Sequence, residues 1–184
     1  MASETRTRMV EGAARLLAMQ GLQGTSFSEV LELTGAPRGS VYHHFPDGKD
    51  QLIAAAIDLA GARALAAVDS WSGRTPEEVT AAFLDLWRSV LVRSNLRAGC
   101  AVLAVTVATD SHDLLGSAAE VFSSWRARLA QVFAEGGHPH PERFAAALVA
   151  GSEGAVVLSR AEQSMEPFEL VAEELLSAAG RSEN

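Results

Sequence analysis

The sequence predicts an all-α protein, and three features of its 184 residues lead to that fold class. Apolar residues recur with helical spacing over most of the chain, without a persuasive alternating strand pattern. Helix-start and helix-stop signals punctuate the chain at short intervals. Hydrophobic residues make up 48% of the composition, enough for a sizeable core. Together these features predict about nine helices, three short ones followed by a larger bundle.

The first two predicted helices have clear ends. An amphipathic helix is expected over residues 5–20, and Gly21 ends it. A second, short helix begins after Ser26, because the spacing of Ser26 and Glu29 is that of a capping box. It stops at Gly35, since glycine is best suited to a left-handed helix end.

A third, very short helix is predicted over residues 37–44. Pro37 opens it, because proline is favoured in the first helical turn. The turn residues 46–48 (Pro-Asp-Gly) close this segment. A long fourth helix follows and ends near Trp71.

The rest of the chain is also predicted to be helical. Residues 75–78 combine an N-cap threonine, a first-turn proline and a capping glutamate, and so start a fifth helix. The apolar run 100–108 fits either a buried strand or a short buried helix, and its helical surroundings favour a helix. Further helices are expected over residues 112–134, 141–160 and 167–179.

The charge distribution narrows the class of function. A net charge of −8 counts against a protein that coats nucleic acid nonspecifically. Residues 1–45, however, contain four arginines and four glutamates, so the acidic excess lies downstream. A neutral N-terminal part can still bind DNA through a few well-placed contacts.

The chain has the features of a cytoplasmic protein. Cys100 is the one cysteine, which excludes an internal disulfide framework and fits a reducing compartment. The N-terminus lacks the basic and apolar regions of a signal peptide. No stretch reaches the ~18 uninterrupted apolar residues of a membrane span, so no membrane association is expected.

The second and third predicted helices form a helix-turn-helix. A few residues containing Gly35 join them, and they follow a longer first helix, as that motif requires. The second helix of such a pair enters the major groove of DNA. Val41 or Phe45 can anchor it in the core. We therefore expect a DNA-binding domain over residues 1–47 and a helical effector-binding and dimerisation domain over residues 48–184.

The third helix carries hydrogen-bonding groups suited to DNA. Arg38 can pair bidentately with guanine or with a phosphate. Gly39 lacks a side chain and lets the backbone come close to the duplex. Ser40, Tyr42 and His44 offer compact hydrogen bonds to phosphates or bases.

Lys49 is the only lysine in the chain and lies in the first turn of the fourth helix. A cation there is unfavourable against the helix dipole unless an anion lies in front of it. A DNA phosphate would serve, held by the helix N-terminus and the lysine together.

Other interpretations of this segment stay open. A generic helix hairpin could display the same polar residues to water. A metal site at His43 and His44 is disfavoured, because adjacent helical residues point about 100° apart. No metal or cofactor is therefore expected.

An all-helical enzyme or small-molecule carrier is a second hypothesis for the function of the whole protein, but no nucleophile–base pair or phosphate loop supports catalysis. A third is a regulator without a small-molecule effector.

The segment GAPRGSVYHHFPDGKDQL, residues 35–52, resembles the recognition helix and following turn of the TetR (tetracycline-repressor) family of bacterial transcription regulators. Upstream, residues 8–35 are similar to the family's first two helices, so the resemblance covers roughly the first third of the chain. The run Tyr-His-His-Phe-Pro-x-Gly-Lys, with the sequence GCAV at Gly99–Val102, resembles the LmrA/YxaF-type branch. Pro37 departs from the serine N-cap of many members.

The resemblance implies a homodimeric, ligand-responsive repressor of a pseudo-palindromic operator. Arg38, Ser40, Tyr42 and His44 would face the DNA, with His43 at a less regular contact position. The residues implied to lie on phosphates are Lys49 and Ser26 or Ser28.

The later helices offer candidates for an effector site, although plain core packing is the favoured explanation for any one of these residues. Pockets form between bundle helices, with a few polar groups that orient the ligand. A small, largely apolar effector would fit these residues. For Cys100 an inert buried thiol is favoured over a redox sensor. The candidates are Phe83, Trp87, Leu91, Cys100, Leu103, Thr106, His112, Phe122, Trp125, Phe144 and Leu148.

The last two predicted helices carry small and apolar residues suited to close helix packing. Two such helices meeting their symmetry mates would form a four-helix dimer interface, and the resemblance implies dimerisation of this kind. The candidates are Ala147, Gly151, Gly154, Ala155, Leu158, Phe168, Val171 and Leu175.

Overall fold

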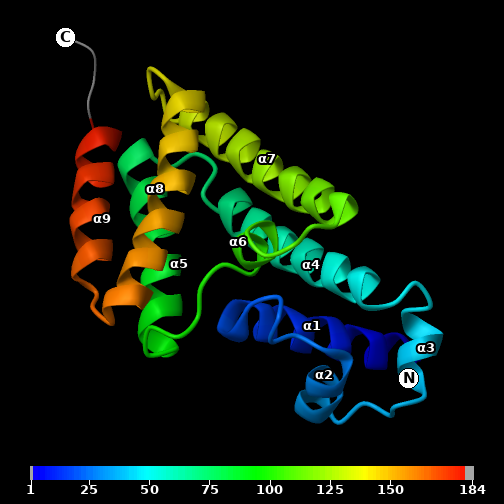
Figure 1. Cartoon of the computed structure of the whole chain (residues 1–184). Coiled ribbons are helices and arrows are strands. Elements are labelled where there is room, and N and C mark those ends of the chain that lie inside the picture. Colours follow the sequence, from blue (N-terminus) through cyan, green and yellow to red (C-terminus); the bar gives the residue numbers. More distant parts are fainter. Residues whose placement is uncertain (1, 181–184) are drawn as a thin grey trace. The chain divides into compact units, whose positions relative to one another are not determined.

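A computed structural model describes residues 2–180, and within that range the chain forms nine helices and no strand (Figure 1). The all-α prediction is therefore confirmed. Met1 and residues 181–184, which the predicted domain ranges include, lie outside the described residues. The helices are α1 (Ala2–Gln20), α2 (Phe27–Thr34), α3 (Ser40–His44), α4 (Lys49–Asp69), α5 (Pro76–Arg93), α6 (Ala101–Thr106), α7 (His112–Glu135), α8 (Pro141–Glu162) and α9 (Glu166–Ala179).

Close packing groups the chain into two compact units. The first unit contains the chain up to Ala62 together with Cys100–Phe122, that is, α1 to α3, α6 and parts of α4 and α7. Of the described residues, the second unit contains Arg63–Gly99 and residues 123–180, that is, the remaining parts of α4 and α7 with α5, α8 and α9. These units are defined by packing alone. The boundary after residue 47, between a DNA-binding domain and an effector-binding and dimerisation domain, stays a prediction.

Two helix starts follow the predicted capping boxes. The Ser26 hydroxyl oxygen accepts a hydrogen bond from the Glu29 N–H at 3.3 Å, and the Glu29 carboxylate accepts one from the Ser26 N–H at 2.9 Å. Thr75 and Glu78 repeat this arrangement at 3.3 and 2.9 Å. Each cap satisfies amides that the helix itself leaves unbonded, which stabilises the start of the helix by about 1 kcal/mol.

Two glycines shape the helix-turn-helix. Gly35 ends α2 with φ 65°, in the left-handed region, and its N–H donates to the Leu31 carbonyl at 2.9 Å. The prediction of this helix end is confirmed. Gly12 lets α1 approach α2 closely, because a Cβ at Gly12 would lie only 2.5 Å from Cγ2 of Thr34.

The third helix begins later than predicted, at Ser40 instead of residue 37. The Ser40 N–H donates to the Pro37 carbonyl at 2.9 Å, and the Val41 N–H donates to the Arg38 carbonyl at 3.4 Å. The Ser40 hydroxyl also donates to the Pro37 carbonyl, at 2.5 Å. These three-residue bonds wind the chain more tightly than an α-helix, so the α-helical pattern starts only afterwards.

Two other helix predictions have clear outcomes. The first helix begins at Ala2, three residues earlier than the predicted residue 5, since no capping signal marks its start in the sequence. The apolar run after Gly99 is helical, as favoured. Its N-cap is Cys100, whose sulfur accepts a hydrogen bond from the Leu103 N–H at 3.4 Å.

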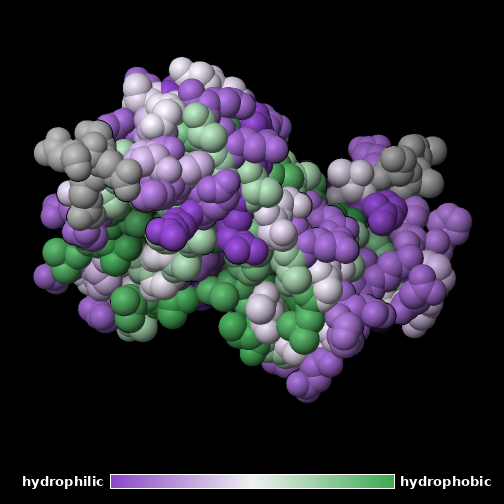
Figure 2. Space-filling model, turned by 90° about the horizontal axis from the view of Figure 1, so that it is seen from above, coloured by the Kyte–Doolittle hydropathy of each residue, from purple (hydrophilic) through white to green (hydrophobic). Residues whose placement is uncertain are grey.

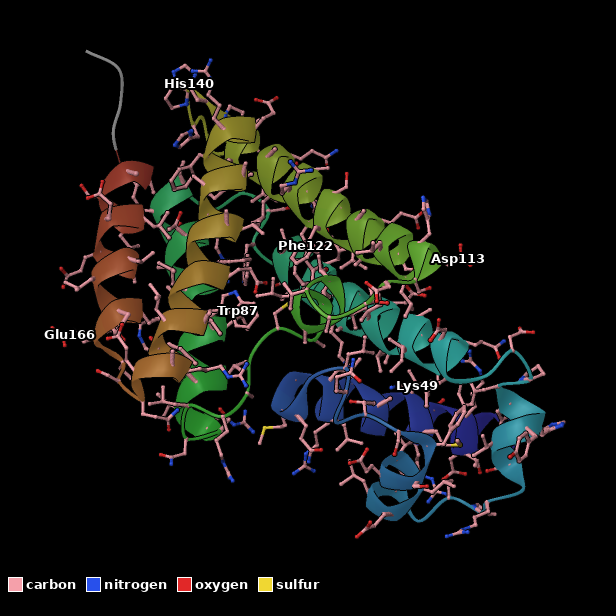
Figure 3. The ribbon with its side chains drawn as sticks, in the orientation of Figure 1. Lys49, Trp87, Asp113, Phe122, His140 and Glu166 are labelled. Carbon is pink, nitrogen blue, oxygen red and sulfur yellow. The ribbon has the colours of Figure 1, made fainter. Side chains whose placement is uncertain are left out.

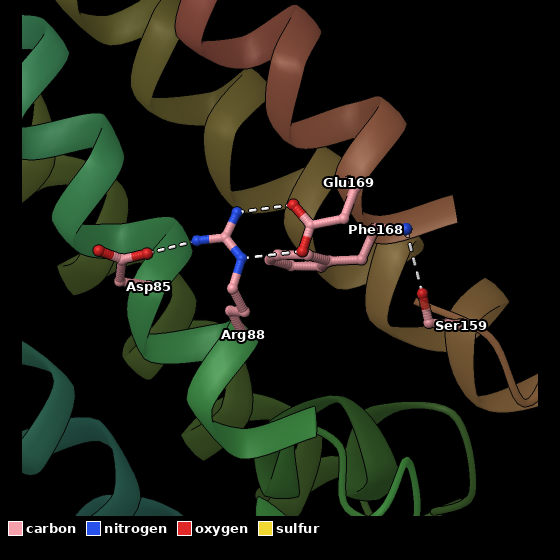
Figure 4. Close-up of polar contacts among 5 residues, drawn as sticks. All are labelled: Asp85, Arg88, Ser159, Phe168 and Glu169. Atoms are coloured by element: carbon pink, nitrogen blue, oxygen red, sulfur yellow. Dashed lines mark hydrogen bonds and ion pairs between the residues drawn. The ribbon is translucent and has the colours of Figure 1, made fainter. Parts of the chain in front are cut away.

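Polar contacts join α5, α8 and α9 in the second unit (Figure 4). Arg88 of α5 binds the Glu169 carboxylate of α9 with two hydrogen bonds, of 2.8 and 2.7 Å, and also pairs with Asp85. The same guanidinium lies 5.6 Å from the centre of the Phe168 ring. The Ser159 hydroxyl of α8 accepts a hydrogen bond from the Phe168 N–H at 3.1 Å. These contacts fix the start of α9.

The contact with Arg88 predicts an acid-dependent loss of stability. Hydrogen bonding to Arg88 lowers the pKa of Glu169 below its usual 4.5, against the opposing effect of burial. A carboxylate with a lowered folded-state pKa stabilises the protein at neutral pH, and this stabilisation is lost as the pH falls through the lowered value. Glu169→Gln should therefore lower the free energy of unfolding at pH 7 by at most about 1 kcal/mol, since both side chains are partly exposed.

Urea unfolding at pH 7 and at progressively lower pH measures this difference. The gap between the wild-type protein and Glu169→Gln should close as the pH drops below 4.5 and past the lowered pKa. Glu173→Gln, at an exposed position of the same helix, is the matched control and should leave stability unchanged. A gap of constant size at every pH would contradict the assignment.

Candidate nucleic-acid interface

Two buried side chains hold α3 against the rest of the helix-turn-helix. Val41 is 4% exposed and Phe45, which directly follows α3, is 1% exposed. The Phe45 ring lies 6.4 Å, centre to centre, from the ring of Phe27 on α2. The predicted anchoring role of Val41 and Phe45 is confirmed, and α3 is thereby oriented relative to α2.

The opposite side of this segment is open to solvent. Tyr42 is 83% exposed, and Arg38, Gly39 and His43 are exposed as well. His44 is half-buried, with its ring 4.9 Å from that of His43. We call these five residues the recognition surface. His43, the less regular position by family resemblance, is thus more exposed than His44.

The three predicted serine contacts differ in their surroundings. Ser28, in the first turn of α2, is exposed. The Ser26 oxygen serves the capping box of α2. Ser40 donates to the Pro37 carbonyl, and its oxygen lies 3.7 Å from the sulfur of Met9 on α1. Two of the three hydroxyls therefore have roles within the fold, and Ser28 presents its hydroxyl to solvent.

Lys49 begins α4 and is half-buried; Figure 3 labels it. Its Nζ donates to the carbonyl of Leu22, between α1 and α2, at 3.1 Å. The ammonium group therefore ties the first turn of α4 to the loop before α2. Since it has three donors, this bond leaves two for a phosphate.

Arg6 is a charged neighbour of the recognition surface that the sequence-based site did not include. Its guanidinium carbon lies 5.4 Å from the centre of the Phe45 ring, within the usual range of a cation–π contact. The two residues are 39 positions apart in the sequence (45 minus 6). An arginine near the start of a helix gives no local signal of such a contact, which depends on packing.

The predicted dimer residues fall into three groups. Ala147, Gly154 and Leu158 are exposed on α8, and Gly151 and Val171 are half-buried. The third group is buried within the chain. It consists of Ala155, Phe168 and Leu175.

Two further apolar residues reach the surface of the same helices. Val157 of α8 is 47% exposed and Leu170 of α9 is 61% exposed. They were missed because the sequence shows which residues share a helix face, but not which face a neighbouring helix covers. On the face that Figure 2 displays, hydrophobic residues form patches among hydrophilic ones.

The predicted effector residues are divided between the two units. Trp87 and Phe122, both labelled in Figure 3, are half-buried, and His112 is exposed. The Thr106 hydroxyl donates to the Val102 carbonyl one turn back, at 2.9 Å. The first unit holds Cys100, Leu103, Thr106, His112 and Phe122. The second unit holds the buried Phe83, Leu91, Trp125, Phe144 and Leu148, together with Trp87.

Perturbed titratable groups occur outside the recognition surface. Burial, followed by the nearby Glu120 carboxylate, raises the pKa of Asp58. Burial, followed by the neighbouring His140, lowers the pKa of His138, which stacks on Phe144 with ring centres 4.6 Å apart. Each shift disfavours the charged form. Within residues 2–180, no three His, Cys, Asp or Glu side chains converge as metal ligands.

Two of the described helices, α4 and α8, are long and apolar enough to cross a bilayer by length and composition alone. Core helices of soluble proteins meet the same criteria. Half of the apolar stretch of α8 is buried within the protein.

Comparisons with known proteins agree with the helix-turn-helix geometry. Residues 9–56 match the family described as bacterial regulatory proteins, tetR family. Residues 76–174 match the C-terminal domain of LmrA/YxaF-like transcriptional regulators.

Relatives match over nearly the whole chain. The HTH-type transcriptional regulator Rv0196 of Mycobacterium tuberculosis is 38% identical over 92% of this chain and 91% of its own length. YxaF of Bacillus subtilis is 27% identical over 94% and 93%. The crystal structure of a TetR transcriptional regulator from Chloroflexus aurantiacus has a TM-score of 0.78 and 29% identity, covering 96% of this chain and 94% of that one. The chain belongs to the TetR family of bacterial transcriptional regulators, and its C-terminal part is of the LmrA/YxaF-like type.

Proposed function

We propose that this regulator is a ligand-responsive homodimeric repressor that binds a pseudo-palindromic operator through α3. The observation that carries the proposal is the recognition surface. A tyrosine that is 83% exposed, on a short helix anchored by buried residues, is suited to contact with another molecule. Arginine, histidine and tyrosine are side chains that hydrogen-bond to bases and phosphates.

We assign separate roles to the side chains of this surface. Arg38 and Tyr42 are proposed to contact base edges or the adjoining phosphates, with His43 and His44 beside them. Gly39 would let the backbone come close to the duplex, and among the described residues only its chain neighbours lie within 4 Å of the position that a Cβ would occupy there. Ser28 and Lys49 are proposed to bind phosphates.

Dimerisation is proposed to use the exposed apolar residues of α8 and α9. The exposure of Leu158, Val157 and Leu170 supports this surface, since apolar side chains gain stability when a partner covers them. Two-fold symmetry would present two copies of α3 to an operator with two matching half-sites.

An effector is proposed to bind among the helices that follow the DNA-binding segment. Repression would be relieved if the effector bound more tightly to the dimer whose two α3 helices no longer fit successive major grooves. We infer a cytoplasmic location, where the operator DNA of a bacterium lies. Control by a protein partner is the alternative to a small effector.

Selection of duplexes from a random pool by the purified protein tests DNA binding directly. Two inverted half-sites, about one helical turn apart centre to centre, are expected among the selected sequences. Footprinting should then show protection of both half-sites. Selection that enriches no sequence over the starting pool would overturn the proposal.

Replacement of Lys49 by glutamine should weaken binding to the operator and to an unrelated duplex by a similar factor. A phosphate contact carries no sequence information, so both complexes lose it. The plot of log K against log salt should become shallower by about 0.9 for each lost contact, and so by about 1.8 for a dimer. Fluorescence anisotropy at several salt concentrations measures both quantities.

Lys49→Arg is the matched control, because it keeps the positive charge and the hydrogen-bond donors. It should retain most of the salt dependence. Loss of operator binding alone, with an unchanged slope for Lys49→Gln, would mean that Lys49 does not bind phosphate.

A further inference from the structure

Arg6 lies outside the two helices of the helix-turn-helix but beside the recognition surface. Its guanidinium carbon lies 5.4 Å from the centre of the Phe45 ring, and Arg6 as a whole is exposed. Phe45 directly follows α3, and its ring is otherwise buried. The contact therefore brings a cation from α1 to the end of α3.

The orientation of α1 supports this position for Arg6. Residues three apart lie on the same face of a helix, so Arg6 and Met9 share one face. The Met9 sulfur lies 3.7 Å from the Ser40 hydroxyl at the start of α3. Through Met9, this face of α1 contacts Ser40, the first residue of α3. Through Arg6, it contacts Phe45, which directly follows α3.

The aromatic contact positions the guanidinium and leaves its positive charge and its N–H donors available to a ligand. A ring face attracts a cation electrostatically but provides no carboxylate that would neutralise it. A guanidinium has five N–H donors in a fixed fork, and that fork matches the oxygens of a phosphate. An arginine held in place by a ring also loses less conformational freedom when it binds a ligand.

We propose that Arg6 binds a backbone phosphate beside the groove that α3 enters, with Phe45 as the platform that orients it. The DNA interface then includes α1 as well as α2, α3 and the start of α4. This inference rests on the proposed DNA-binding function. It predicts a sequence-independent contact, whereas a contact between the recognition surface and a base edge would depend on the DNA sequence.

The test compares Arg6→Ala, Arg6→Lys and Arg8→Ala by fluorescence anisotropy, on a duplex selected by the wild-type protein and on a random-sequence duplex. Arg8 is the matched control, since it is exposed on the same helix but points about 200° away from Arg6. Circular dichroism checks that each variant remains folded.

Arg6→Ala should weaken binding to both duplexes by about tenfold or more, and should reduce the salt slope by about 1.8 per dimer. Arg6→Lys should keep most of the slope, and Arg8→Ala should match the wild-type protein. Equal losses from Arg6→Ala and Arg8→Ala, or no loss from Arg6→Ala, would overturn the inference. A loss confined to the selected duplex would also overturn it, because that result indicates a base contact.

The two proposals fail in different ways. If the wild-type protein bound no selected sequence more tightly than random DNA, the operator-binding proposal would fail. The comparison of Arg6→Ala with Arg8→Ala on random duplex would still decide whether Arg6 contacts phosphate.

Discussion

Replacement of Tyr42 by alanine is expected to weaken operator binding by roughly 100-fold while leaving the fold intact. A hydrogen bond to a charged or tightly matched partner is worth about 1.5 kcal/mol or more, and a two-fold dimer loses two of them. The side chain is 83% exposed, so its removal costs little packing. Anisotropy titrations with the selected duplex give the affinity, and thermal melting gives the stability.

Tyr42→Phe separates the contribution of the hydroxyl from that of the ring. If the hydroxyl makes the contact, Tyr42→Phe should lose most of the affinity that Tyr42→Ala loses. If Tyr42 contacts a base edge, binding to random duplex should change much less than binding to the operator; if it contacts the adjoining phosphate, both should weaken by a similar factor. Full operator affinity in Tyr42→Ala would remove this residue from the interface.

Replacement of Phe45 by alanine is expected to have the largest effect on stability. Truncation of a buried phenylalanine costs about 3–5 kcal/mol, a large share of the total stability of a small domain. Phe45 is 1% exposed, and it contacts Phe27, Arg6 and His44. Without it α3 loses one of its two buried anchors, so operator binding should fall together with stability.

Because Phe45 belongs to the first unit, the loss of stability must be measured with a signal that comes from that unit. Trp71, Trp87 and Trp125 all belong to the second unit, so tryptophan fluorescence follows that unit alone. Circular dichroism detects helix loss in both. Phe45→Ala should therefore lower the unfolding midpoint of the dichroism signal, while Phe45→Leu, which keeps most of the volume, should lower it much less. Equal midpoints for Phe45→Ala and the wild-type protein would exclude the anchoring role.

Predictions from the sequence were confirmed where the structure depends on single residues or on interactions between residues close together in the chain. The pairs Ser26–Glu29 and Thr75–Glu78 form capping boxes because each partner is three residues away. Gly35 adopts the left-handed conformation that glycine tolerates without strain. The start of α3 was wrong because several backbone patterns compete after a proline. Here the hydrogen bonds to Pro37 favoured the tighter turn.

The parts of the interface that were missed depend on contacts between distant residues. The cation–π pair of Arg6 and Phe45 and the bond from Lys49 to Leu22 exist only after α1, α3 and α4 have packed. The periodicity of α8 likewise identified apolar residues, but it did not distinguish the buried Ala155 from the exposed Leu158. Which face is covered depends on the neighbouring helices.

The hydrogen bond from Lys49 to the Leu22 carbonyl also closes a ring. The bond joins two residues that are 27 positions apart, so the segment between them is a closed loop. This loop contains α2 and α3. Closure of a loop removes conformational freedom before any ligand arrives. The recognition helix would therefore lose less entropy on meeting DNA. Acetylation of this amine would remove its charge and leave one N–H donor, so the Leu22 carbonyl and a phosphate could no longer both be bound and the affinity for DNA would fall.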